Sequence, residues 1–89
     1  MSELVTSEVV IRDTTYTVQE MTGKVMNEVR KAIDVDKSRV ETLVVFRCLV
    51  VPKLASESEA AALPQFVVNK LSAEIFRLTN GEGDEAKNA

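Results

Sequence analysis

Histidine and tryptophan are absent from this sequence of 89 residues, which contains a single cysteine. Because histidine is the commonest general base and the commonest metal ligand, its absence argues against most hydrolytic and transition-metal sites. Cys48 has no partner for an internal disulfide and lies in an apolar run, so a reduced, structural cysteine is expected. A nucleophilic Cys48 would need a nearby base and an electropositive, partly exposed setting. The sequence therefore predicts a protein that is not an enzyme and needs no metal or other cofactor.

Clustered positive charge and long hydrophobic runs are also missing. The chain has 11 Lys and Arg against 14 Asp and Glu, and no stretch gathers the basic residues, so nucleic acid is not an expected partner. The apolar run at residues 43–51 is far shorter than the roughly 20 residues that span a bilayer, and no signal peptide is recognisable. We expect a cytoplasmic protein that does not enter the membrane.

The length suits one domain, predicted over residues 1–80, followed by a disordered acidic tail at residues 81–89. The hydrophobic content of 45% comes mostly from Val, Leu and Ala, which predicts an aliphatic core. A domain this small leaves much of its surface uncovered, and so a homo-oligomer or another protein partner is expected to supply further burial.

A β-hairpin is predicted at the start of the domain. Residues 8–11 and 14–18 are rich in Val, Ile, Thr and Tyr, and Arg12-Asp13 between them suits a turn. A lone hairpin is marginally stable in water, so it must pack on the segments that follow. These segments have helical patterns, and the predicted fold class is α+β: a short N-terminal β-hairpin followed by a small bundle of three to four α-helices.

The first two predicted helices are residues 23–33 and 40–51. Thr22 suits the N-cap of the first helix. The spacing Asp34-x-Asp36 begins like a calcium loop but lacks the downstream Gly and Glu of that motif, so it predicts a break between helices. Ser38-x-x-Glu41 then resembles a capping box, and Pro52 is expected to end the second helix. The β-branched residues of this run would also suit a buried strand, but its length favours a helix.

Two further helices are predicted nearer the C-terminus. Ser56-x-x-Glu59 is a second capping box before a short helical turn at residues 60–63. A longer helix is expected over residues 64–78, with Asn80-Gly81 as a left-handed stop. One face of this helix carries a narrow apolar stripe that consists of Val67, Val68, Leu71, Ile75 and Leu78.

Apolar residues outside the expected core are candidates for protein binding. In the last helix, Phe66, Ala73 and Phe76 fall outside the apolar stripe, and Phe46 lies on the second helix, which is apolar nearly all round. Large apolar side chains outside a core are natural interface anchors. The alternative is that Phe66 and Phe76 cover the hairpin or a neighbouring helix of the same molecule.

The order of these features resembles the small tail assembly chaperones of long-tailed bacteriophages. The resemblance extends from about residue 15 to residue 81 and rests on caps, prolines and apolar helices. The segments that carry it are VQEMTGK (residues 18–24), DKSRVE (36–41), VPKL (51–54), SESE (56–59), LP (63–64) and LTNG (78–81).

The resemblance implies a protein of the host cytoplasm that binds the tape measure protein and keeps it soluble while the tail tube assembles, and that is absent from the mature virion. It further implies a longer form, made by ribosomal frameshifting, whose extension recruits the major tail protein. The alternative function is a small cytosolic adaptor or antitoxin-like regulator that binds one folded protein partner.

Overall fold

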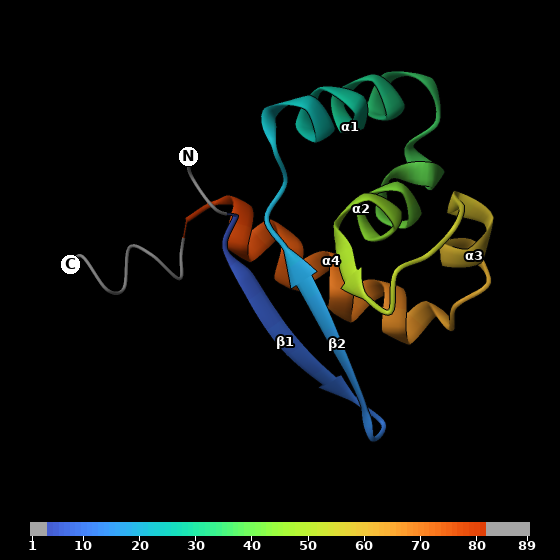
Figure 1. The fold of residues 1–89 in the computed structure, drawn as a ribbon. Helices are drawn as coiled ribbons and strands as arrows, with labels where there is room; N and C mark the ends of the chain where they lie inside the picture. Colours follow the sequence, from blue (N-terminus) through green and yellow to red (C-terminus); the bar gives the residue numbers. More distant parts are fainter. Residues whose placement is uncertain (1–3, 82–89) are drawn as a thin grey trace.

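The computed structural model describes residues 4–81, which form one three-stranded antiparallel sheet and four α-helices. The hairpin comes first and the helices follow, with a short third strand among them (Figure 1). The predicted α+β class is therefore confirmed. The predicted disordered tail lies, apart from Gly81, outside the described residues.

The hairpin consists of β1 (Thr6–Ile11) and β2 (Thr14–Gln19), slightly longer than predicted. Ile11 pairs with Thr14, so only Arg12 and Asp13 connect the strands. Both have positive φ angles, 49° and 69°, because a two-residue turn with this left-handed backbone matches the twist of the paired strands.

The first helix, α1 (Gly23–Val35), begins where the sequence predicts. The Thr22 hydroxyl accepts a hydrogen bond from the backbone N–H of Val25 at 3.2 Å. The Asp36 carboxylate then accepts from the N–H of Ser38 and caps a single 3₁₀ turn, η1 (Lys37–Arg39). Helix α2 follows directly, with Arg39 at its N-cap position and no capping hydrogen bond from a side chain, so the predicted capping box at Ser38 and Glu41 is wrong.

The second predicted helix is shorter than expected. It is α2 (Val40–Cys48), and the next three residues form strand β3 (Leu49–Val51). Leu49 has extended backbone angles and lies opposite Val18, and Val51 lies opposite Thr17, so this segment adds a third strand to the hairpin. The prediction of a helix to residue 51 is therefore wrong. Pro52 follows a strand, and the β-branched character of Val50 and Val51 suits that strand.

The last two helices are α3 (Glu57–Ala61) and α4 (Gln65–Thr79). The Ser56 hydroxyl caps α3 by accepting from the N–H of Glu59, as predicted, but the Glu59 carboxylate accepts from the N–H of Ala55 and not from that of Ser56, so the reciprocal bond of the capping box is absent. After α4, Gly81 adopts a φ of 79° and its N–H donates to the Leu78 carbonyl at 3.0 Å. The predicted left-handed stop is confirmed.

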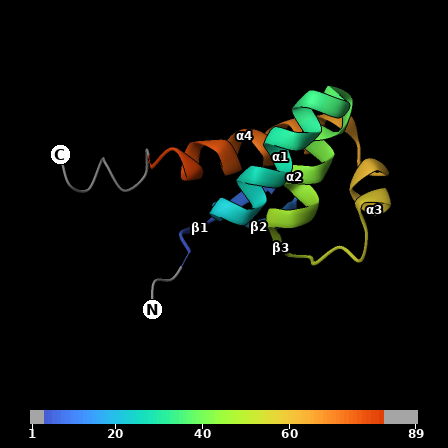
Figure 2. The same ribbon diagram turned by 90° about the horizontal axis from the view of Figure 1, so that it is seen from above.

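The helices cover one face of the sheet only. Helix α4 runs behind β1 and β2 and also contacts α2, which in turn contacts α1 and α3 (Figures 1 and 2). The buried residues on these elements form one aliphatic cluster, in which Val18, Val44, Val45, Leu71 and Ile75 are fully buried. The opposite face of the sheet, which we call the front face, has no helix over it (Figure 2).

An ion pair joins η1 to α3. Arg39 Nη2 lies 2.8 Å from Glu57 Oε1, and Arg39 Nε donates to Glu57 Oε2 at 3.1 Å. These hydrogen bonds, together with the guanidinium charge, hold the pKa of Glu57 below its ordinary value of 4.5.

This shifted pKa predicts how stability depends on pH. Folded Glu57 takes up a proton less readily than unfolded Glu57, so the stabilisation is fully present above pH 4.5 and is lost as the pH falls through the lower folded pKa. Urea midpoints measured between about pH 7 and about pH 3 check this, and Arg39→Gln should lose less stability over that range than the wild type. Parallel curves for the two proteins would contradict the prediction.

Candidate protein-binding surface

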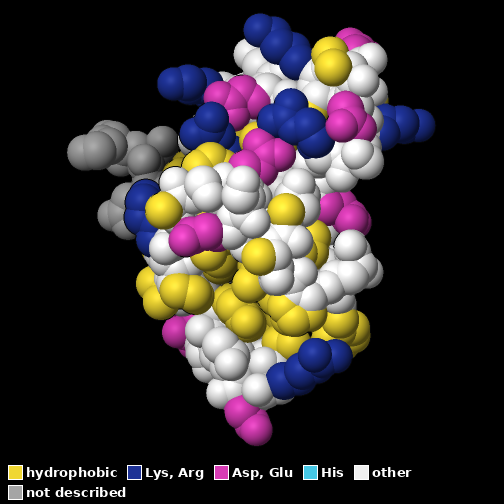
Figure 3. Space-filling view, turned by 90° about the vertical axis from the view of Figure 1, so that its right-hand side faces the viewer, with side chains coloured by type: hydrophobic (Ala, Val, Ile, Leu, Met, Phe, Trp, Pro, Cys, Tyr) yellow, Lys and Arg dark blue, Asp and Glu magenta, His cyan; other side chains and the backbone are white. Residues whose placement is uncertain are grey.

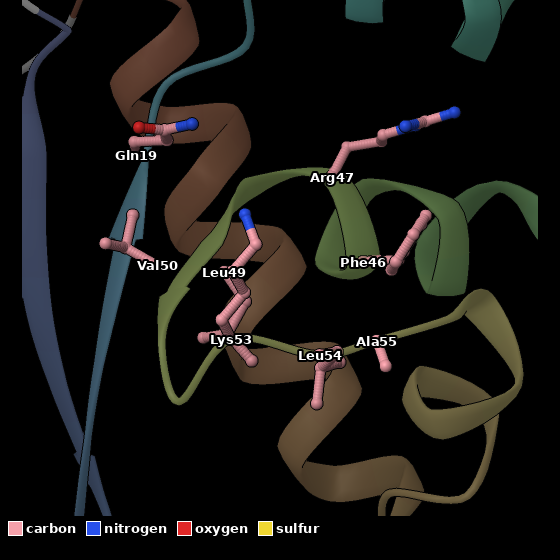
Figure 4. A pocket seen from close by; sticks show the side chains of 8 residues that line it. All are labelled: Gln19, Phe46, Arg47, Leu49, Val50, Lys53, Leu54 and Ala55. Atoms are coloured by element: carbon pink, nitrogen blue, oxygen red, sulfur yellow. The ribbon is translucent and has the colours of Figure 1, made fainter.

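A cavity of about 460 Å³ opens between the end of α2, strand β3 and the loop that follows β3. Figure 4 shows Gln19 and Arg47 on opposite sides of it, with the Lys53 side chain extending between them. The residues that line the cavity are Gln19, Phe46, Arg47, Leu49, Val50, Lys53, Leu54 and Ala55.

The cavity combines an apolar wall with a basic rim. Phe46, Leu49, Val50, Leu54 and Ala55 are the apolar residues that line it, and Phe46 and Leu54 also pack against the core. Arg47 is already engaged, because its Nε lies 2.9 Å from Glu28 Oε1 and its guanidinium lies 5.1 Å from the centroid of the Phe46 ring. Such a site suits an aliphatic or aromatic side chain that a partner inserts, because the wall offers apolar contact and no carboxylate.

The cavity continues onto the front face of the sheet. Gln19 and Val50 line the cavity, and beside them Val51 lies opposite Thr17 on β2. Val51 and Val10 are 54% and 69% exposed, which is unusual for large aliphatic side chains on a sheet. We define the cavity–front face surface as the cavity lining together with Val10, Thr15, Thr17 and Val51.

The four residues predicted to bind protein do not share one environment. Phe46 is half-buried and lines the cavity, and no residue of α4 does so. Phe66 is 46% exposed and Ala73 is exposed, two turns apart on α4. Phe76 is half-buried and packs against the core. Packing within the molecule, the alternative for Phe66 and Phe76, accounts for much of the apolar surface of Phe76 but not of Phe66, and Phe46 also packs against the core.

The predicted residues omit several that belong to the cavity–front face surface. The sequence pattern predicts a helix for Val50 and Val51, and on a helix these residues would not share a surface with the hairpin. In the structure they belong to β3. Val10 lies on β1 next to Ile11, which is buried, and alternation along the strand then places Val10 on the front face. The β-branched run at residues 49–51 is the sequence signal that could have identified this third strand.

Cys48 is a free cysteine that lies in the core at the end of α2. Cys48 is 1% exposed, and burial raises the pKa of its thiol to about 11, opposite to the shift that activates a nucleophile. Residues 4–81 contain no group of three or more His, Cys, Asp or Glu side chains placed to hold a metal ion. Within the same residues, no helix has the length and apolar character needed to cross a membrane.

The burial of Cys48 predicts its reactivity. In the native protein at neutral pH, the thiol should react with an aromatic disulfide reagent at least about a hundredfold more slowly than in denaturant, because it is both inaccessible and protonated. Absorbance of the released thiolate measures both rates. Equal rates in the two conditions would mean that Cys48 is exposed.

The cavity–front face surface combines exposed aliphatic side chains with polar and basic ones, a mixture that is common where one protein contacts another. No family model, curated protein or solved structure matches this chain.

Proposed function

We propose that this protein is a phage tail assembly chaperone that binds apolar segments of the tape measure protein and keeps that protein soluble during assembly of the tail tube. The observation that carries this proposal is the cavity–front face surface, where a cavity of about 460 Å³ adjoins a sheet face without a covering helix. An exposed surface of this kind is typical of a protein that covers apolar parts of another chain.

The chemistry of the surface suits an amphipathic helical client. A row of apolar side chains on such a helix can rest on Val10 and Val51 of the front face while one larger side chain enters the cavity next to Phe46. Each contact is small, so several copies bound along one long client would together give firm binding. Polymerising tube subunits could still displace single copies.

The proposal places the protein in the host cytoplasm and outside the finished virion. In this proposal a longer frameshifted form recruits the major tail protein, and the short form described here covers the tape measure protein. Self-association into an oligomer is compatible with the size of the domain, since small domains gain stability from extra burial.

Co-expression tests the proposal. The chain is produced together with the longest open reading frame encoded just downstream of its gene, and the soluble fraction of the long protein is measured with and without it. We expect the long protein to be soluble only in the presence of this chain. A long protein that is soluble alone, or that forms no complex, would contradict the proposal.

The mass of the purified complex distinguishes the chaperone from the alternative, an adaptor or antitoxin-like regulator. Several copies of this chain on one long partner are expected for a chaperone that coats its client. One copy bound to one folded partner would favour the regulator.

A further inference from the structure

A second surface lies at the turn of the hairpin, where Arg12 and Lys70 flank an exposed aromatic ring. The Arg12 guanidinium lies 5.1 Å from the centroid of the Phe66 ring, and the Lys70 ammonium lies 5.4 Å from it. Phe66 nevertheless stays 46% exposed. We call these three residues the Phe66 cluster, and none of them lines the cavity.

The backbone holds Arg12 in an uncommon conformation. Its φ of 49° lies in the left-handed region, which is unfavourable for a long side chain and is usually occupied by Asn or Gly in such turns. The two-residue turn requires this conformation, and it brings Arg12 to the end of the hairpin, where its guanidinium lies over the Phe66 ring of α4.

The positive charges of the Phe66 cluster are not neutralised within the described part of the chain. Arg39, Arg47 and Arg77 each pair with a glutamate. Among residues 4–81, neither Arg12 nor Lys70 forms an ion pair, and neighbouring Asp13 forms none either. Two unpaired cations beside an exposed ring attract a ligand that has both carboxylates and apolar groups.

The surroundings of the Phe66 cluster extend this surface along α4. Ala73 is exposed two turns after Phe66, and its small side chain lets another backbone approach closely. Figure 3 shows hydrophobic side chains gathered in the lower half of one face, with basic and acidic side chains near the bottom, whereas charged side chains crowd the upper part. Along α4, a ligand the length of a short helix would meet Phe66 and Ala73, with Arg12 and Lys70 beside the ring.

We propose that the Phe66 cluster and Ala73 form a docking site for an acidic, amphipathic helical segment of a partner protein. The carboxylates of the segment bind Arg12 and Lys70, and its apolar side chains cover the Phe66 ring. This site is independent of the cavity–front face surface, so it gives the protein a second point of attachment.

The test uses a fluorescent amphipathic peptide in which glutamates flank a stripe of leucines, and measures its binding to the full chain by anisotropy. We expect the double variant Arg12→Glu/Lys70→Glu, and separately Phe66→Ala, to weaken binding at least about tenfold. The control Lys24→Glu/Lys37→Glu makes the same change in charge at two exposed positions elsewhere and should leave binding unchanged. Circular dichroism confirms that each variant is folded.

Several results would overturn the proposal. One is that the peptide shows no detectable binding. Another is that a peptide with lysines in place of the glutamates binds as tightly as the acidic peptide. A third is that the control variant loses as much binding as the double variant. Loss of binding in Val50→Asp but not in the double variant would place the peptide in the cavity instead. Tighter binding of a mixed-sequence single-stranded oligonucleotide at the same residues would mean that the site recognises phosphate.

Discussion

Val50→Asp is expected to abolish most binding of the client that we propose for this protein, the tape measure protein. Val50 lines the cavity and is 38% exposed, so a partner that covers it would enclose the new carboxylate in an apolar contact. A loss of roughly 2 kcal/mol or more is typical of a central interface residue and corresponds to about 30-fold weaker binding. The soluble fraction of the co-expressed long protein and the dissociation constant of the purified complex measure this loss.

Ile33→Asp is the matched control for this experiment. Ile33 is an aliphatic residue of α1 with a similar exposure of 45%, and it does not line the cavity. Its substitution should leave client binding within about twofold of the wild type, because isolated surface changes away from an interface have small effects. Equal losses from the two variants would mean that added negative charge, and not the cavity, determines binding.

Leu71→Ala is expected to destabilise the domain by about 3 kcal/mol, the second large effect. Leu71 is fully buried on α4, which contacts α2 on one side and both strands of the hairpin on another, so its truncation leaves a cavity in the centre of the core. For a domain of this size, that loss corresponds to a fall in melting temperature of roughly 15 °C. Thermal and urea unfolding followed by circular dichroism measure both quantities.

Two further variants define the scale of that effect. Ile75→Val removes one methyl group from a fully buried side chain and should cost only about 1 kcal/mol. Val35→Ala removes two methyl groups from a side chain that is 82% exposed and should change stability by no more than about 0.5 kcal/mol. A Leu71→Ala protein as stable as Val35→Ala would contradict the burial of α4 described here.

Local signals predicted most of the fold because they depend on neighbouring residues. Thr22 and Ser56 cap helices through bonds within a few positions, and Gly81 ends α4 with a left-handed φ. The hairpin followed in the same way from its two-residue turn. The end of α2 could not be predicted in this way. Residues 49–51 form a strand because they pair with β2, which is distant in the sequence.

The candidate surfaces were harder to predict for the same reason. The cavity assembles residues from β2, α2, β3 and the loop after β3, so a helical pattern for residues 40–51 could not indicate it. Phe66 was identified from its place outside the apolar stripe of α4. The contact between Phe66 and Arg12 could not be identified from the sequence, because it depends on how the turn of the hairpin packs against α4.

Hydrogen–deuterium exchange on the purified complex with the tape measure protein tests the central claim most directly. If the client covers the cavity–front face surface, amides of residues 15–19 and 49–55 should exchange at least about tenfold more slowly in the complex than in the free protein. Slower exchange confined to α1, with residues 49–55 unchanged, would contradict the assignment of this surface to client binding.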